Sequence, residues 1–205
     1  MPLDAVRFPR VAKYLGALPD GLSSHPTALV KGSFVRAALE DRRIGGFVDA
    51  LPEEITQLIE RPPLVSTWIR SVYAQALFLA AADEHAMTDE QFGDWSYRVQ
   101  KRLFGSPLYR AVAVVATPRM LLAGTRMRWG AFHRGTTIEI VDHVSRDAAT
   151  VTMAYPSMLY ARTNLVGFAR GFQAVAELSN ALVALVELGP SHATSARFDV
   201  RWRER

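Results

Sequence analysis

The spacing of apolar residues changes along the chain, from a helical period in the first two thirds to strict alternation near the end. Phe198, Val200 and Trp202 alternate with charged residues. A period of two is typical of a strand with one buried face and one exposed face. The sequence predicts four strands, over 137–144, 150–155, 181–188 and 197–203. The first two form a hairpin. The apolar run 181–186 predicts a central strand.

Between the two strand pairs, residues 164–178 return to helical spacing. Gly167 and Gly171 lie inside this predicted helix, where each glycine costs about 1 kcal/mol relative to alanine. Close packing of the helix on the sheet would compensate for this cost. The alternative is a ligand pressed against the helix backbone. The order strand, strand, helix, strand, strand predicts an antiparallel sheet with one helix across it.

The first 132 residues are predicted to be mostly helical. Four prolines in residues 1–27 predict an irregular arm. The fold class is therefore α+β, with a mostly helical N-terminal half followed by a four-stranded antiparallel sheet. After the arm we expect one domain over 28–205, with a helical part over 28–132 and a sheet part over 133–205. Helices are predicted over 29–42, from Pro52 to Ile59, after Ser66 or Thr67, after the capping box that begins at Thr88, over 108–116, and from Pro118 to Phe132.

Composition narrows the class of protein. The chain is 49% hydrophobic and 21% charged, as in globular domains. It contains no cysteine, which excludes disulfides, thiolate nucleophiles and cysteine-bound metals. No secretory signal and no 18-residue uncharged apolar span occurs, so we expect a cytoplasmic protein without a membrane-spanning helix.

Positive charge is concentrated in the second half. Residues 106–205 carry 12 basic and 7 acidic side chains, and every basic one is arginine. An arginine-favouring genome explains this, and an anion-binding face is the alternative. Arg119, Arg126 and His133 are spaced by seven and would share one helix face. A cation at the end of that helix is favoured by the helix dipole, which alone explains His133; an anion or ligand site is the alternative.

Motifs for catalysis and metal binding are absent. The chain has no Gly-x-Ser-x-Gly elbow, phosphate loop, dinucleotide fingerprint or His-Glu-x-x-His. No two histidines are three or four residues apart. The acidic pairs at 53–54 and 89–90 lie in first helical turns, where acids are expected in any case. No cofactor, metal site or catalytic residue is predicted.

Aromatic residues are the remaining candidates for a binding site. They could line an apolar cavity between the helical part and the sheet, although aromatic residues at helical spacing also form ordinary cores. The candidate ligand-binding residues are Trp129, His133, Tyr155, Tyr160 and Trp68, and the candidate anion-binding residues are Arg119 and Arg126.

A family resemblance adds to this interpretation. It is carried by Val30-Lys31-Gly32, Ser66-Thr67-Trp68, Thr117-Pro118, Trp129, the glycine-bearing helix and Phe198–Trp202. These residues resemble an uncharacterised paralogous family abundant in myxobacteria, and the element order resembles the heme-NO-binding and vinyl-4-reductase-like fold. The resemblance implies a sensory or docking domain. The heme sensors of this fold have a proximal histidine and a Tyr-x-Ser-x-Arg clasp, the vinyl-reductase-type domains have cysteines, and this chain has neither the clasp nor a cysteine. We therefore expect no heme and no zinc.

The resulting hypothesis is a non-catalytic sensory or docking domain that binds a small apolar ligand or a partner protein in signalling or regulation. The alternative is an arginine-mediated binder of nucleic acid or of an acidic protein; an enzyme with a cryptic acid/base site ranks below both. Added salt distinguishes the first two, because counterion release weakens nucleic-acid binding steeply. No recognition motif favours nucleic acid. The apolar face of the last strand makes a homodimer possible.

Overall fold

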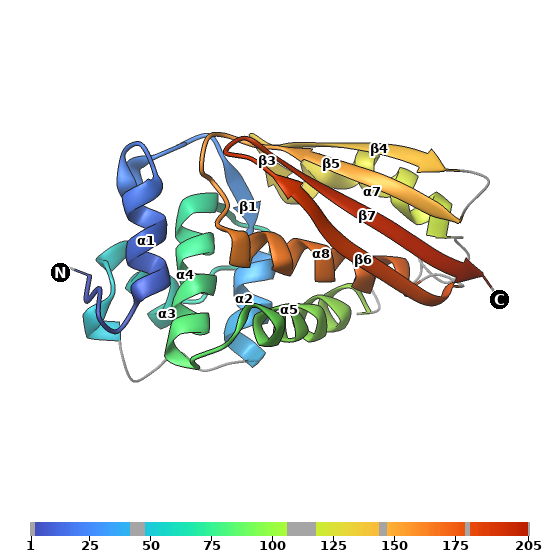
Figure 1. The fold of residues 1–205 in the computed structure, drawn as a ribbon. Helices are drawn as coiled ribbons and strands as arrows, with labels where there is room; N and C mark the ends of the chain where they lie inside the picture. Colours follow the sequence, from blue (N-terminus) through green and yellow to red (C-terminus); the bar gives the residue numbers. More distant parts are fainter. Residues whose placement is uncertain (1–2, 42–47, 106–117, 144–146, 179–180, 205) are drawn as a thin grey trace.

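The computed structural model describes residues 3–41, 48–105, 118–143, 147–178 and 181–204 (Figure 1). Its helices are α1 (Pro9–Ala17), α2 (Gly32–Asp41), α3 (Glu53–Glu60), α4 (Ser71–Glu84), α5 (Asp89–Phe104), α7 (Pro118–Phe132) and α8 (Arg162–Ala176), with 3-10 turns η1 (Gly21–Ser23) and η2 (Val48–Ala50). Its strands are β1 (Leu29–Lys31), β2 (Trp68–Arg70), β3 (His133–Arg134), β4 (Thr137–His143), β5 (Ala148–Ala154), β6 (Ala181–Ser191) and β7 (Ser195–Glu204).

The last third forms an antiparallel sheet in the spatial order β4-β5-β7-β6, and α8 connects its two strand pairs along the chain. The predicted hairpin is confirmed, with Ile140 opposite Val151, which in turn lies opposite Phe198. The prediction of a central strand at 181–186 is wrong, because within the described residues β6 lies at the edge of the sheet and pairs only with β7. Val186 is buried whereas Leu185 is 45% exposed, so β6 also has one open face.

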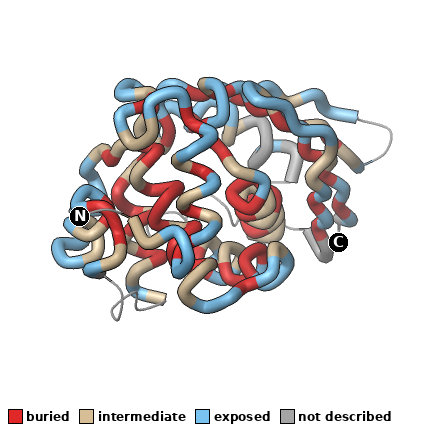
Figure 2. Tube along the Cα trace, turned by 60° about the vertical axis from the view of Figure 1, so that its left-hand side comes forward, coloured by how far each residue is buried: buried red, intermediate tan, exposed pale blue. Residues whose placement is uncertain are grey.

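Helices cover one face of this sheet and leave the other open. The inner face carries Val151, Phe198, Val200 and Trp202, all buried. In Figure 1, α8 lies between the sheet and α5, and it contacts α5, β6 and β7. Helix α7 contacts β4 and α8. Exposed and buried residues alternate along the strands (Figure 2), which confirms the half-exposed strand predicted at 197–203.

Helix α8 packs closely on α5. A Cβ atom built on Gly167 would lie 3.0 Å from Cε1 of Phe92, and one built on Gly171 would clash with the side-chain amide of Gln100. The Ser96 hydroxyl and the Gln100 amide both donate to the Gly167 carbonyl oxygen, each at 3.1 Å. Close packing thus explains the two glycines, although their partner is helix α5 rather than the predicted sheet.

A second sheet has the order β2-β1-β3, and two of its strands, β1 and β2, lie within the part predicted to be helical. The helices predicted from 29 and from about 67 begin only at Gly32 and Ser71, because the residues before them pair as antiparallel strands. The Gly32 amide donates to the Thr67 carbonyl and the Ser71 amide donates to the Ala28 carbonyl, both at 2.8 Å. Strands of three residues are too short to show a period of two.

The predicted irregular arm contains helix α1. Pro9 occupies its first turn, where a missing N–H costs nothing. The Asp83 carboxylate of α4 accepts from the Arg10 and Val11 amides at 2.9 and 3.3 Å and pairs with the Arg10 guanidinium at 3.3 Å. Other starts and ends were predicted correctly: Thr88 forms a capping box with Gln91, and α7 ends at Phe132. The helix predicted over 108–116 lies outside the described residues.

Candidate ligand-binding site

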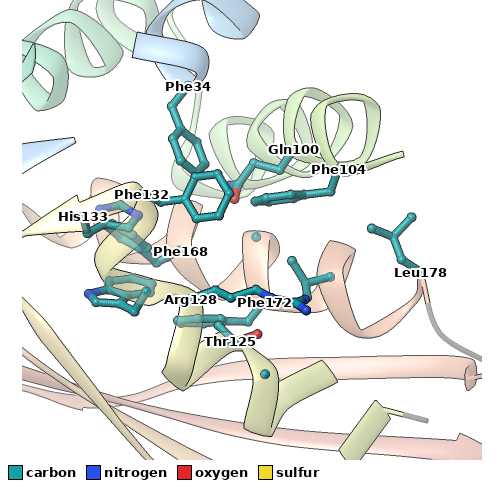
Figure 3. Close-up of a pocket in the computed structure, with 14 residues that line it drawn as sticks. Phe34, Gln100, Phe104, Thr125, Arg128, Phe132, His133, Phe168, Phe172 and Leu178 are labelled. Atoms are coloured by element: carbon teal, nitrogen blue, oxygen red, sulfur yellow. The ribbon is translucent and has the colours of Figure 1, made fainter. Parts of the chain in front are cut away.

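An apolar cavity of about 140 Å³ lies between α2, α5, α7 and α8 (Figure 3). Its size is close to that of an engineered apolar protein cavity of ~150 Å³ that binds benzene or xenon. Side chains from all four helices line it. Because α2, α5 and α7 belong to the helical part and α8 to the sheet part, the cavity lies where the two parts meet. The aromatic residues that line it are Phe34, Phe104, Trp129, Phe132, Phe168 and Phe172.

Three of these rings form one side of the cavity (Figure 3). Phe34 of α2, Phe104 of α5 and Phe132 of α7 pack edge to face, with centroid distances of 5.9, 5.9 and 6.0 Å. Edge-to-face contacts place the positive edge of one ring against the negative face of the next. The trio therefore joins the three helices around the cavity.

His133 forms another part of the wall and is buried, with 6% of its surface exposed. Its ring stacks on Trp129 at 4.1 Å and 16°, and the Trp129 Nε1–H donates to the Thr136 hydroxyl at 3.0 Å. Burial lowers the pKa of His133 to about 3, so the imidazole is neutral at physiological pH. Its Nδ1 has no hydrogen-bond partner in the described part of the chain.

The structure corrects the sequence interpretation of His133. This residue begins strand β3, opposite Val30 of β1, and does not close helix α7. The helix dipole stabilises a cation, and the buried imidazole of His133 is neutral, so the dipole does not stabilise it. The dipole explanation for His133 is therefore wrong.

A smaller cavity of about 60 Å³ lies next to the first. Both cavities share wall residues Phe34, Gln100, His133 and Phe168. The smaller one has a more polar set of neighbours, because Gln75, Trp95, Ser96 and Asn164 also line it.

Tyr155 and Tyr160 are buried, but they are not part of the cavity wall. Their rings pack edge to face at 4.9 Å, and Tyr160 contacts Phe168 in the same way at 4.9 Å. The Tyr155 hydroxyl donates to the His192 carbonyl at 3.0 Å, and burial raises the Tyr155 pKa to about 12. Burial raises the pKa of Tyr160 as well. Neither tyrosine lines a cavity; they support Phe168, which does.

The remaining candidates lie elsewhere. Trp68 is in β2, with the Lys31 ammonium 4.0 Å and the Arg134 guanidinium 4.1 Å from its ring centroid. Arg126 is exposed on α7, and the side chain of Arg119 lies outside the described residues. Thus Trp129 and His133 come together at the cavity, while Trp68 and Arg126 do not join them.

Sequence reasoning did not identify the phenylalanines of the wall. The predicted helices over 29–42 and 164–178 contain Phe34, Phe168 and Phe172. Their helical spacing indicates burial but does not show which apolar residues surround a void. The packing of α5 on α8 determines which apolar side chains surround the void. In the sequence, this packing is indicated by the pair of glycines in α8.

Comparisons with known proteins support the fold. No family model matches the chain, and no curated protein sequence is significantly similar to it. Its structure is similar to an Fe(II) unliganded H-NOX protein from K. algicida, with a TM-score of 0.57 and 16% identity over 85% of this chain and 97% of that one. It is also similar to an H-NOX mutant from T. Tengcongensis, with a TM-score of 0.51 and 13% identity over 85% of this chain and 98% of that one. A third similar structure is an oxygen-binding H-NOX domain related to soluble guanylate cyclases, with a TM-score of 0.52 and 10% identity over 84% of this chain and 93% of that one. The chain therefore has an H-NOX-like α+β fold.

Because this fold implies a heme, the cavity can be tested for one. A cavity of about 140 Å³ suits a single six-membered ring and is too small for a porphyrin. The loop after β5 has Tyr155 and Ser157 in the spacing of the clasp, but Leu159, fully buried, stands where the clasp has arginine. The His133 ring lies flat on Trp129. The residues of this site do not fit a heme.

Two further findings apply to the described residues. They contain no group of three or more histidine, aspartate or glutamate side chains placed to hold a metal ion. None of their helices is both long enough and apolar enough to cross a membrane.

Proposed function

We propose that this protein is a non-catalytic sensory domain that binds a small, uncharged, mainly apolar molecule in the aromatic cavity between α2, α5, α7 and α8. The observation that carries the proposal is the cavity itself, about 140 Å³, walled by six aromatic rings and one buried neutral imidazole. Well-formed apolar pockets with a few polar groups are the usual binding sites of small molecules.

The charge of the wall supports an uncharged ligand. In the described part of the wall there is no aspartate or glutamate, and its one cationic side chain, Arg128, is exposed. An ion would lose its hydration there without gaining a buried partner, which is costly. The absence of a carboxylate next to His133 also leaves the imidazole without the orienting partner that a general base has.

The sensory role rests on the fold. Its structural neighbours include an oxygen-binding H-NOX domain, and another H-NOX structure concerns the mechanism of H-NOX activation. We extend the sensory role, and not the heme, to this chain.

Filling the cavity tests the proposal. Gly124 of α7 lines the cavity, and among the described residues a Cβ atom there would meet only the Arg128 guanidinium, at 4.0 Å. Gly124→Leu should therefore place its side chain in the void and weaken binding of benzene and ethylbenzene at least tenfold, measured by ligand-observed NMR and calorimetry.

Gly130→Leu is the matched control. Gly130 lies on the same helix, is exposed, and would have no atom within 4 Å of an added Cβ. It should leave the affinity unchanged. If the original chain binds neither molecule, or if both variants bind as it does, the cavity is not the ligand site.

A further inference from the structure

The smaller cavity has buried hydrogen-bonding groups that lack partners. The indole Nε1–H of Trp95, the side-chain amide Nδ2 of Asn164 and Nδ1 of His133 make no hydrogen bond within the described part of the chain. All three side chains line this cavity, and their exposed fractions are 3%, 3% and 6%. Buried polar groups in native proteins are almost always satisfied by protein, water or ligand. Three such groups around one void therefore indicate that something polar occupies it.

The chemistry of these groups defines the occupant. An indole N–H only donates. The Asn164 Oδ1 already accepts from the Ala161 amide at 3.1 Å at the start of α8, which leaves Nδ2 as a donor. Two hydrogen-bond donors, Trp95 Nε1–H and Asn164 Nδ2–H, therefore lack an acceptor among the described residues.

The charge of that acceptor follows from the wall. Among the residues that the structure describes, no charged side chain lines the smaller cavity, and His133 is neutral. A carboxylate would be buried there without a counterion, at a large cost. A neutral acceptor, such as a carbonyl oxygen, loses much less on leaving water.

We propose that the smaller cavity is the polar end of the ligand site and receives the carbonyl group of a small neutral ketone, aldehyde or ester whose apolar body fills the larger cavity. The wall shared by the two cavities, Phe34, Gln100, His133 and Phe168, brings them next to each other. This inference rests on the function proposed above and adds the chemical class of the ligand.

The test compares acetophenone with ethylbenzene, which has the same ring and a similar shape but no acceptor. Because the two donors can bind its carbonyl oxygen, acetophenone should bind about tenfold more tightly than ethylbenzene, measured by calorimetry. Without them the carbonyl would only lose its hydration, and acetophenone would bind more weakly than ethylbenzene. The infrared carbonyl band of bound, isotope-labelled acetophenone should move to lower wavenumber.

Two tryptophan variants locate the effect. Trp95→Phe keeps the ring but removes one donor, and it should reduce the preference for acetophenone several-fold. Trp202→Phe is the control, because the Trp202 Nε1 is also buried and unpartnered in the described structure but Trp202 lines neither cavity. It should leave the preference unchanged.

The outcomes separate the two proposals. If ethylbenzene and acetophenone bind equally well, the apolar site stands and the acceptor subsite is wrong; the polar groups then hold only water. The same conclusion follows if Trp95→Phe does not change the preference. If neither molecule binds, both proposals fail.

Discussion

Two effects oppose each other at His133, and their magnitudes decide its state. A helix dipole stabilises a terminal cation by at most about 2 kcal/mol. Lowering the pKa from 6.5 to about 3 by burial corresponds to several kcal/mol against the cation. Burial therefore prevails. The stacked partner Trp129, whose N–H is held by Thr136, keeps the neutral ring against the cavity.

The buried imidazole predicts a pH dependence of stability. The folded state binds the proton of His133 only near pH 3, whereas the unfolded chain binds it near pH 6.5, so the contribution is complete above pH 6.5. As the pH falls below 6.5 the unfolded state gains the proton first, and the free energy of unfolding should fall by up to about 1.4 kcal/mol per pH unit. Urea unfolding between pH 7 and 5 measures this slope.

Two variants assign the slope to this residue. His133→Phe should flatten the dependence between pH 7 and 5, because it removes the buried titrating group. His192→Gln changes an exposed histidine and should retain it. Equal slopes in the original chain and in His133→Phe would show that His133 is not buried as a neutral group.

At the scale of elements, the sequence was most informative where a periodic pattern extends over many residues. Strands β5 and β7 alternate over six or more residues, so the alternation predicted them, whereas β6 was predicted from a continuous apolar run. The pairing within each strand pair follows from its short connection. Strands β1 and β2 each have three residues and merge into the helices that follow, so no period distinguishes them. Helix α1 was missed because its flanking prolines indicate a break, although Pro9 is placed where a helix tolerates it.

The candidate site was predictable only in part, for a related reason. Trp129 and His133 were both named as candidates; they lie four residues apart at the junction of the two parts, and their rings stack. Phe34, Phe104 and Phe168 come from three other helices, and only the packing of those helices brings them around one void. Spacing along one helix does not contain that information.

The packing of α5 on α8 makes a prediction of its own. In an exposed helix, glycine to alanine stabilises by about 1 kcal/mol. At Gly167 the new methyl would lie 3.0 Å from the Phe92 ring and 3.1 Å from the Ser96 hydroxyl, so these two packed side chains must shift by a few tenths of an ångström. Gly167→Ala should therefore lower the free energy of unfolding by about 1–3 kcal/mol, as measured by urea unfolding.

The matched variant is Gly130→Ala on α7, where the added methyl meets no atom within 4 Å. It should raise the free energy of unfolding by up to about 1 kcal/mol. Stabilisation by Gly167→Ala as well would mean that α5 and α8 do not pack as closely as described.

At the scale of the whole molecule, the chain and the H-NOX structures have a similar fold and mostly different side chains. The similarity covers 85% of this chain at 16% identity, so the arrangement of helices and sheet is shared while most side chains differ. In this chain the rings of Phe34, Phe104 and Phe132 occupy the space between α2, α5 and α7. A fold defines where a ligand can lie, and the side chains define which ligand it is.

This difference predicts that the protein does not take up heme. An inserted porphyrin would have to displace the phenylalanine trio and the stacked pair of His133 and Trp129, and the loop after β5 has Leu159 in place of the arginine of the clasp. Mixing the purified protein with hemin and a reductant should give the absorption spectrum of free heme, without the sharpened Soret band of a histidine-bound iron. Preincubation with ethylbenzene should leave that spectrum unchanged. A sharp Soret band that disappears in His133→Phe would instead make His133 an axial ligand, and the cavity would then have to open far beyond its present volume.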